Sequence, residues 1–167
     1  EMEALADLCV KNGKIDPELY AKYDVKRGLR DINGNGVLTG LTDISEIRSS
    51  RMENGIKIPC EGQLFYRGYS IEDLVRSMPS DHSFGFEVTA YLLLFGELPN
   101  KEQLDGFIKQ LSFYRTLPTN FVRDIIMKAP SGDMMNTLAR SVLTMYSYDD
   151  APDDISIPNV LRQCIQL

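Results

Sequence analysis

The hydrophobic positions along most of the chain repeat at the spacing of amphipathic helices. In residues 88–95, 104–111 and 157–165 the apolar side chains fall at i, i+3, i+4 and i+7, which predicts three helices. The first is also apolar on its other side, at Leu93 and Leu94, so we expect it to be buried within a larger body. A further helix is predicted near residues 134–146. The residues expected to line its inner face are Met135, Leu138, Ala139, Val142, Met145 and Tyr146.

Residues that start and stop helices flank these stretches. A first helix over residues 1–12 has Ala4, Leu5, Leu8 and Cys9 on one face and a stop at Gly13, and a second begins at Asp16-Pro17. Gly96 ends the strongly apolar helix. A short helix from Ser70 to about Met78 and another over residues 118–130 complete the helical prediction. The predicted N-terminal caps are Asp16, Ser70, Asn100 with Gln103, Asp133 and Ser156.

Between residues 27 and 69 the pattern changes to short alternating runs separated by turn residues. Residues 37–42, 56–58 and 64–66 alternate with period two, which predicts strands, and a polar connector follows the first of them. Asn33-Gly34, Asn35-Gly36, Asn54-Gly55 and Glu61-Gly62 supply the turns. We therefore predict an all-α, mainly helical chain with a small β-hairpin region near residues 36–67.

Two segments are distinctive in their order and spacing. They read Glu61-Gly62-x-Leu64-x-Tyr66-Arg67-Gly68-Tyr69-Ser70-Ile71-x-Asp73-Leu74 and Glu87-Val88-x-x-Tyr91-Leu92-Leu93-Leu94-Phe95-Gly96-Glu97-Leu98-Pro99. Before them stand Gly28-Leu29-Arg30-Asp31, Gly34-x-Gly36-Val37 and Gly40-Leu41-Thr42-x-Ile44-Ser45. Together these segments resemble the N-terminal part of citrate synthase, and the resemblance extends from about Tyr23 to the end of the chain.

The resemblance implies a fold, a reaction and partners. It implies that residues 1–167 form the N-terminal part of the large helical domain of a homodimer, with the catalytic C-terminal portion absent. It implies condensation of acetyl-CoA with oxaloacetate and water to give citrate and CoA, an acyl transfer. Close relatives of the family use propionyl-CoA, so 2-methylcitrate synthase is an alternative. The last helix stops without a glycine, a basic turn or a proline, and we therefore expect the chain to be a piece of a longer one.

The resemblance also implies which residues would react. In the family a histidine and an aspartate enolise the acetyl group, a second histidine polarises the ketone of oxaloacetate, and arginines hold its carboxylates. None of those motifs has a matching position in this sequence. We therefore assign no catalytic, cofactor-binding or metal-binding residue and imply no cofactor, since acetyl-CoA is a substrate. The 167 residues alone are expected to be catalytically inactive.

Composition narrows the picture only slightly. The net charge of −6 argues against a general nucleic-acid binder, and no apolar run is long enough to cross a membrane. The N-terminus lacks the pattern of a signal peptide. Cys9, Cys60 and Cys164 are widely spaced, which disfavours a disulfide framework or a zinc site and favours a reducing compartment. These features predict a cytoplasmic protein that binds neither membrane nor nucleic acid.

Several smaller patterns resemble functional sites. Asp31-x-Asn33-x-Asn35-Gly36 matches the first half of a calcium-binding loop, but position 12 is Thr42, so turns are the favoured reading. The glycines at 34, 36 and 40 lack the sequence context of a phosphate-binding loop. His82, the single histidine, has no evident nucleophile beside it and is interpreted as a surface residue.

Charged residues receive similarly plain interpretations. The guanidinium groups of the N-terminal half suit carboxylates or phosphates, but surface ion pairs are the better reading of any one of them. They belong to Arg27, Arg30, Arg48, Arg51, Arg67 and Arg76. Arg67 is expected to hold the hairpin to a neighbouring helix. The acidic residues 149–154 are interpreted as a solvated loop.

Two other classes of protein stay open at the level of the sequence. The apolar stripes would also suit a helical interaction module without chemistry, which would bind a partner stoichiometrically. A calcium sensor would show a calcium-dependent melting temperature, and Thr42 argues against it.

Overall fold

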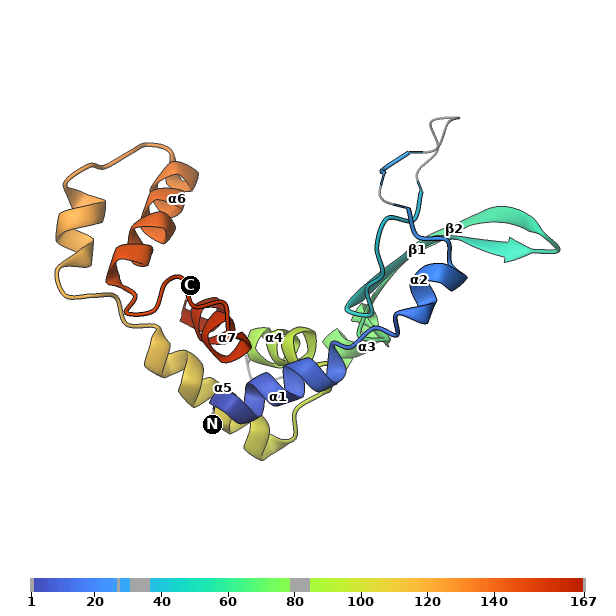
Figure 1. Ribbon diagram of the computed structural model, residues 1–167, viewed down its shortest axis with the longest axis horizontal. Coiled ribbons are helices and arrows are strands. Elements are labelled where there is room, and N and C mark those ends of the chain that lie inside the picture. Colours follow the sequence, from blue (N-terminus) through green and yellow to red (C-terminus); the bar gives the residue numbers. More distant parts are fainter. Residues whose placement is uncertain (1, 27, 31–36, 79–84, 167) are drawn as a thin grey trace. The chain divides into compact units, whose positions relative to one another are not determined.

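The computed structural model describes residues 2–26, 28–30, 37–78 and 85–166. The described residues are mainly helical and include a three-stranded antiparallel sheet of order β1-β2-β3 (Figure 1). The chain divides into two compact units. The N-terminal unit is Asp7–Leu104, and the C-terminal unit is Asp105–Leu167 together with Glu1–Ala6.

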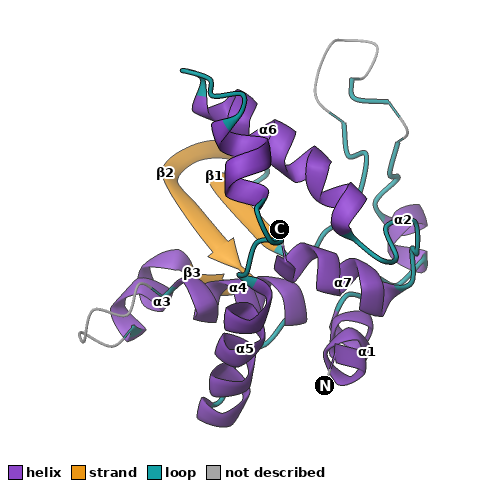
Figure 2. Cartoon of the chain, turned by 90° about the vertical axis from the view of Figure 1, so that its left-hand side faces the viewer, coloured by secondary structure: helices purple, strands orange, loops and turns teal. Residues whose placement is uncertain are grey.

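The described elements up to the end of the N-terminal unit are four helices and the three strands of the sheet. They are α1 (Met2–Asn12), α2 (Glu18–Lys22), β1 (Ser45–Glu53), β2 (Ile56–Tyr66), β3 (Tyr69–Ser70), α3 (Ile71–Ser77) and α4 (Phe86–Phe95). In Figure 2, β1 and β2 form a long curved ribbon with β3 at its base beside α3. The predicted combination of helices with a small hairpin region is thus confirmed.

The position of the strands corrects the sequence interpretation. Residues 37–42 carry no strand, and the stretch interpreted as a polar connector contains β1. β1 pairs with β2 from Ser45↔Tyr66 to Glu53↔Ile56, with a shift in register between Arg48 and Ser50. Every residue of β1 but one is exposed, so pairing across the hairpin, and not an apolar face, makes this segment a strand. Alternation of side chains could not reveal it.

The strongly apolar helix α4 forms the core of the N-terminal unit, as predicted. Tyr91, Leu92 and Phe95 are at most 2% exposed, and the rings of Tyr91 and Phe95 lie 4.6 Å apart. The helix ends at Gly96, whose φ of 79° lies in the left-handed region that glycine adopts without strain. The Gly96 N–H donates to the carbonyl of Leu92 at 2.9 Å, which closes the last turn.

Two predicted side-chain caps are confirmed by hydrogen bonds. Before α5 (Lys101–Tyr114), the Asn100 N–H donates to the Gln103 side chain at 2.8 Å, and the Gln103 N–H donates back to the Asn100 side chain at 2.9 Å. This reciprocal pair is a capping box. Asp133 accepts from the Asn136 N–H at 3.1 Å. Ser70 precedes α3 as predicted, but its side chain makes no capping bond.

The C-terminal unit is built from helices. After α5 come the π-helical segment η1 (Val122–Met127), α6 (Met134–Met145), the short 3-10 segment η2 (Tyr146–Tyr148) and α7 (Ile157–Gln166). Phe121 is 1% exposed, and its ring contacts that of Tyr148 with the centroids 5.6 Å apart. Leu161 and Ile165 of α7 are also buried, which confirms the predicted helical spacing of this segment.

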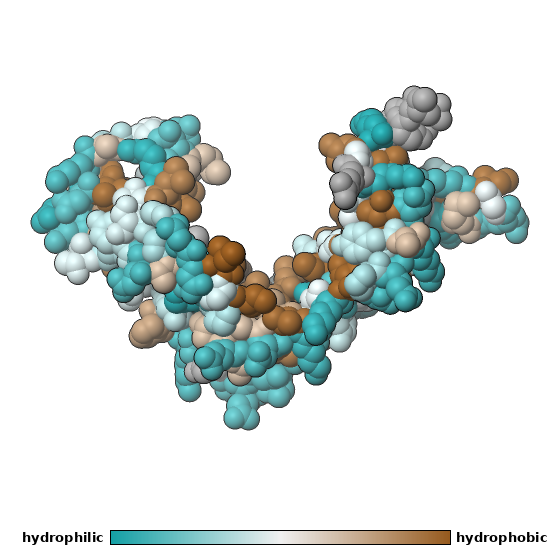
Figure 3. All heavy atoms as spheres, in the orientation of Figure 1, coloured by the Kyte–Doolittle hydropathy of each residue, from teal (hydrophilic) through white to brown (hydrophobic). Residues whose placement is uncertain are grey.

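Helix α6 corrects a second expectation. The residues predicted to line its inner face are mostly exposed. Figure 3 shows hydrophobic residues, in brown, at the surface among hydrophilic ones. We call the exposed set the α6 apolar face: Met134, Met135, Leu138, Val142, Leu143 and Tyr146, with exposed fractions from 47% to 79%. The less exposed side of the helix carries hydroxyls, and Ser141 and Thr144 donate to the carbonyls one turn earlier. Periodicity identified the apolar side but not its neighbours.

Replacement of Gly96 by alanine should destabilise the N-terminal unit. A Cβ at this position would lie 2.7 Å from the Cβ of Asn12, and the φ of 79° disfavours any L side chain. We expect Gly96→Ala to lower the free energy of unfolding by roughly 1–3 kcal/mol in urea titrations followed by circular dichroism. Gly62→Ala is the matched control, since its Cβ would meet open space. Equal unfolding midpoints for the two variants would contradict this account.

Candidate functional site

Arg67 stands at the tight turn between β2 and β3. Its φ is 48° and that of Gly68 is 85°, so the chain reverses through two left-handed residues. The Arg67 N–H donates to the carbonyl of Ile44 at 2.8 Å. This backbone geometry directs the side chain inward, where it is only 6% exposed.

The Arg67 guanidinium joins three other segments of the N-terminal unit. Nη1 donates to the carboxylate of Asp43 at 2.7 Å and to the carbonyl of Asn12 at 3.3 Å. Nη2 donates to the carbonyl of Leu93 in α4 at 3.1 Å. The Asn12 side chain in turn donates to the carbonyl of Phe95 at 2.6 Å. The prediction that Arg67 holds the hairpin to a neighbouring helix is confirmed.

We call this set of contacts the Arg67 clamp. It consists of Arg67, Asp43 and Asn12 with the carbonyls of Leu93 and Phe95. A guanidinium has five donors, and those that bond here serve the protein itself. Nε is buried and finds no partner among the described residues. The clamp is therefore a structural centre and not a pocket for a substrate carboxylate.

Three other N-terminal arginines form surface ion pairs, as the sequence predicted. Arg48 pairs with Glu46, Arg51 with Glu53 at 2.7 Å, and Arg76 with Glu72 at 3.6 Å. All these side chains are substantially exposed, so each pair contributes little to stability. Arg30 is exposed, and Arg27 lies outside the described residues.

In the acidic segment 149–154, Asp150, Asp153 and Asp154 are exposed, as expected for a solvated loop, and Asp149 alone departs from that interpretation. Asp149 is 13% exposed, and both of its oxygens accept from Nη2 of Arg162 at 2.7 and 2.8 Å. It also accepts from the Ala151 N–H and from Gln163 Nε2, each at 3.0 Å. Asn159, 8% exposed, accepts from Arg162 Nε at 3.0 Å. The loop is therefore fixed to the polar side of α7.

The sequence held a signal for this cluster that the acidic run obscured. Polar residues on α7 recur at the spacing of one helix face: Asn159, Arg162, Gln163 and Gln166. An arginine in such a stripe is a candidate partner for a nearby carboxylate. The bonds from Arg162, Ala151 and Gln163 hold the pKa of Asp149 at about 2, well below its ordinary value. A carboxylate with so low a pKa is a poor general base near neutral pH.

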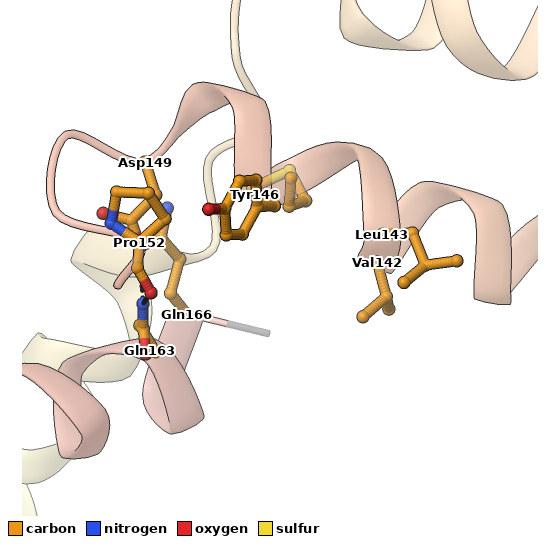
Figure 4. Close-up of a pocket in the computed structure, with 8 residues that line it drawn as sticks. Val142, Leu143, Tyr146, Asp149, Pro152, Gln163 and Gln166 are labelled. Atoms are coloured by element: carbon orange, nitrogen blue, oxygen red, sulfur yellow. Dashed lines mark hydrogen bonds between the residues drawn. The ribbon is translucent and has the colours of Figure 1, made fainter. Parts of the chain in front are cut away.

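A cavity of about 370 Å³ lies beside this cluster. Its lining is Val142, Leu143, Met145, Tyr146, Asp149, Pro152, Gln163 and Gln166. In Figure 4, Asp149, Pro152, Gln163 and Gln166 gather on one side, and Val142 and Leu143 lie on the other. A second cavity of about 420 Å³, bordered by Tyr114, Asp150 and Arg162, shares Asp149. The first cavity offers apolar contact and amide hydrogen bonds, but its carboxylate is already bonded.

The remaining sequence candidates receive no structural support. His82 and the loop from Asp31 to Gly36 lie outside the described residues. Within the described ranges no group of three histidine, cysteine or acidic side chains could hold a metal ion. In the same part of the chain, every helix is too short or too polar to cross a membrane. The three cysteines are free thiols.

Comparison with known proteins gives a consistent result. The family model described as "Citrate synthase, C-terminal domain" matches residues 32–166. The chain is 34% identical over 128 residues to 2-methylcitrate synthase 1 of Corynebacterium glutamicum, covering 77% of this chain and 28% of that protein. It is 33% identical over 132 residues to the citrate synthase of Haloferax volcanii, covering 78% and 29%.

A solved structure is similar as well. The crystal structure of citrate synthase from Pyrobaculum aerophilum superposes with a TM-score of 0.59 at 27% identity, and the match covers 83% of this chain and 34% of that one. By the coverages of 28% and 29% given above, the chain spans less than a third of the length of the two curated relatives.

The ion pair between Asp149 and Arg162 should make stability depend on pH in acid. The pKa of Asp149 falls from 3.8 to about 2 on folding, so the pair stabilises the fold fully above pH 3.8. This stabilisation is lost as the pH falls toward 2. We expect Asp149→Asn to lower the urea midpoint at neutral pH, with the difference from the parent shrinking in acid. Asp150→Asn, at an exposed neighbour, is the control, and a difference independent of pH would refute the assignment.

Proposed function

Because the chain belongs to the citrate synthase family, a family of acyltransferases, we propose that it is part of an enzyme that condenses acetyl-CoA with oxaloacetate and water to give citrate and CoA. The observation that carries the proposal is the match of the family model to residues 32–166. The similarity of the fold to a solved citrate synthase supports it independently.

The identity of the acyl group that the enzyme transfers is a second, more specific part of this proposal. The chain is about as similar to a 2-methylcitrate synthase as to a citrate synthase, which keeps propionyl-CoA as the alternative substrate. Acetyl-CoA and propionyl-CoA differ by one methylene group, and discrimination of that size arises from the shape of the acyl pocket. The full-length enzyme is where this preference should be measured.

We place the 167 residues in the N-terminal part of the large helical domain. The order of the Tyr66-Arg67-Gly68-Tyr69 and Leu93–Pro99 segments supports this placement. The reactive groups expected from the family include two histidines, whereas this sequence contains one. Arg67 and Arg162 serve the fold itself, because both form ion pairs within their own unit. We therefore propose that the 167 residues alone do not hold the substrates in a reactive arrangement.

The purified 167-residue chain should not release CoA from acetyl-CoA in the presence of oxaloacetate. We expect free thiol formation, measured with a thiol-reactive dye, to equal the signal without oxaloacetate. That blank is essential, because the chain contributes three free cysteines of its own. The longer protein from the same gene, assayed with acetyl-CoA and then propionyl-CoA, is the positive control. Oxaloacetate-dependent release by the 167 residues would overturn the proposed inactivity, and no release by the longer protein would overturn the proposed enzyme.

We also propose that the protein forms a homodimer. The α6 apolar face supports it, since a contiguous exposed apolar surface is the usual mark of an interface. A two-fold interface brings the same surface of both copies together, so one helix face can meet itself. The interaction module considered from the sequence would use the same face for a different partner.

Substitution within this surface should change the oligomeric state without unfolding the chain. Leu143 is 75% exposed, so Leu143→Asp removes little buried area within one copy. We expect the parent to sediment as a dimer and the variant as a monomer with an unchanged circular dichroism spectrum. Asn136→Asp adds the same charge to an exposed polar position of α6 and should leave the dimer intact. A parent that sediments as a monomer would contradict the proposal.

A further inference from the structure

The turn that joins β1 to β2 carries a reactive dipeptide. Asn54 and Gly55 have φ values of 51° and 79°, and Glu53 pairs directly with Ile56. This is a two-residue turn with both residues left-handed, the form that Asn-Gly favours. Both residues are exposed, and a Cβ at Gly55 would meet no atom within 4 Å. The turn is therefore an open tip with nothing packed against it.

A second Asn-Gly pair lies in opposite surroundings. Asn12 is the last residue of α1, and its side-chain amide donates to the carbonyl of Phe95 at 2.6 Å. The Gly13 N–H donates to the carbonyl of Cys9 at 2.9 Å. The carbonyl of Asn12 accepts from Arg67 in the clamp. At this pair the side-chain nitrogen of Asn12, the Asn12 carbonyl and the Gly13 N–H each form a hydrogen bond.

We propose that Asn54 is a site of spontaneous deamidation in the folded protein, and that Asn12 is protected by the Arg67 clamp. The backbone nitrogen of Gly55, after losing its proton to solvent base, attacks Cγ of Asn54. A nitrogen–carbon bond forms, the bond from Cγ to Nδ2 breaks, and ammonia leaves with a proton from water. Water then opens the cyclic imide at either carbonyl, which gives aspartate or isoaspartate. No oxidant, reductant or enzyme is required.

Geometry decides which pair reacts. The attack needs the backbone around Asn54 to rotate until the Gly55 nitrogen approaches Cγ, and glycine places no side chain in the way. At the tip this rotation disturbs only the end of a hairpin, where local opening costs little free energy. At Asn12 the rotation would break the last turn of α1 and the hydrogen bond to Phe95. Asn12 should therefore be protected from deamidation in the folded chain and not in the unfolded chain.

The product would alter the hairpin. Deamidation adds one negative charge next to Glu53, and isoaspartate lengthens the backbone by one carbon atom. A two-residue turn sets the register of the strands it joins, so the pairing of Glu53 with Ile56 cannot survive the longer backbone unchanged. Pairing at the far end of the ribbon, near Ser45 and Tyr66, is distant from the change. We expect a loosened tip on an otherwise native sheet.

The test compares the two sites within one molecule. The native chain is incubated at mildly alkaline pH and sampled over time, with a parallel incubation in concentrated urea. Trypsin releases residues 52–57, and a protease that cuts after glutamate releases residues 4–18, so mass spectrometry follows each asparagine separately. We expect Asn54 to react at least about tenfold faster than Asn12 in the native chain, and urea to remove most of that difference.

A matched variant tests the assignment in the intact protein. Asn54→Gly keeps a turn that accepts two left-handed residues but has no side-chain amide. Charge-sensitive electrophoresis of aged native protein should show more acidic species in the parent than in this variant, because Asn33-Gly34 and Asn35-Gly36 are common to both chains. The proposal is overturned if Asn12 and Asn54 react equally in the native chain. It is also overturned if urea leaves the ratio of their rates unchanged.

Discussion

The buried charge of Arg67 is the constraint on which the N-terminal unit depends. A guanidinium that is 6% exposed must be paired and hydrogen-bonded, since an unpaired buried charge is strongly destabilising. Asp43 supplies the countercharge, and the carbonyls of Asn12 and Leu93 supply further acceptors. The end of α1, the β2–β3 turn and α4 are therefore fixed by the same group. The left-handed φ of Arg67 is the local cost of this arrangement.

The C-terminal unit uses the same device with different partners. Arg162 of α7 bonds to Asp149, Asn159 and Gln166, and this fixes the loop between η2 and α7. The depressed pKa of Asp149 follows from these bonds and keeps the carboxylate ionised, which suits a structural anchor. Arg67 and Arg162, each paired with a carboxylate, thus organise the fold.

Membership of the citrate synthase family and the exposed α6 apolar face fit together in a simple physical picture. The family's fold is mainly helical, and a helix with one apolar side is stable in water only when that side is covered. Within the described residues the less exposed side of α6 carries hydroxyl groups, and most of its leucine, valine and methionine side chains are exposed. The chain spans less than a third of the length of its two curated relatives.

The sequence by itself determined the helices whose apolar residues repeat regularly, the capping box at Asn100, the stop at Gly96 and the family. These depend on neighbours within a few residues, which a linear pattern records. Only the tertiary structure decided that β1 is a strand, that Asp149 is bonded to Arg162 and that the apolar side of α6 faces outward. Each of these depends on a partner brought near by folding. Hydrophobic periodicity gives the direction in which a side chain points from the axis of its own helix or strand. It does not say which other segment of the chain packs against that side.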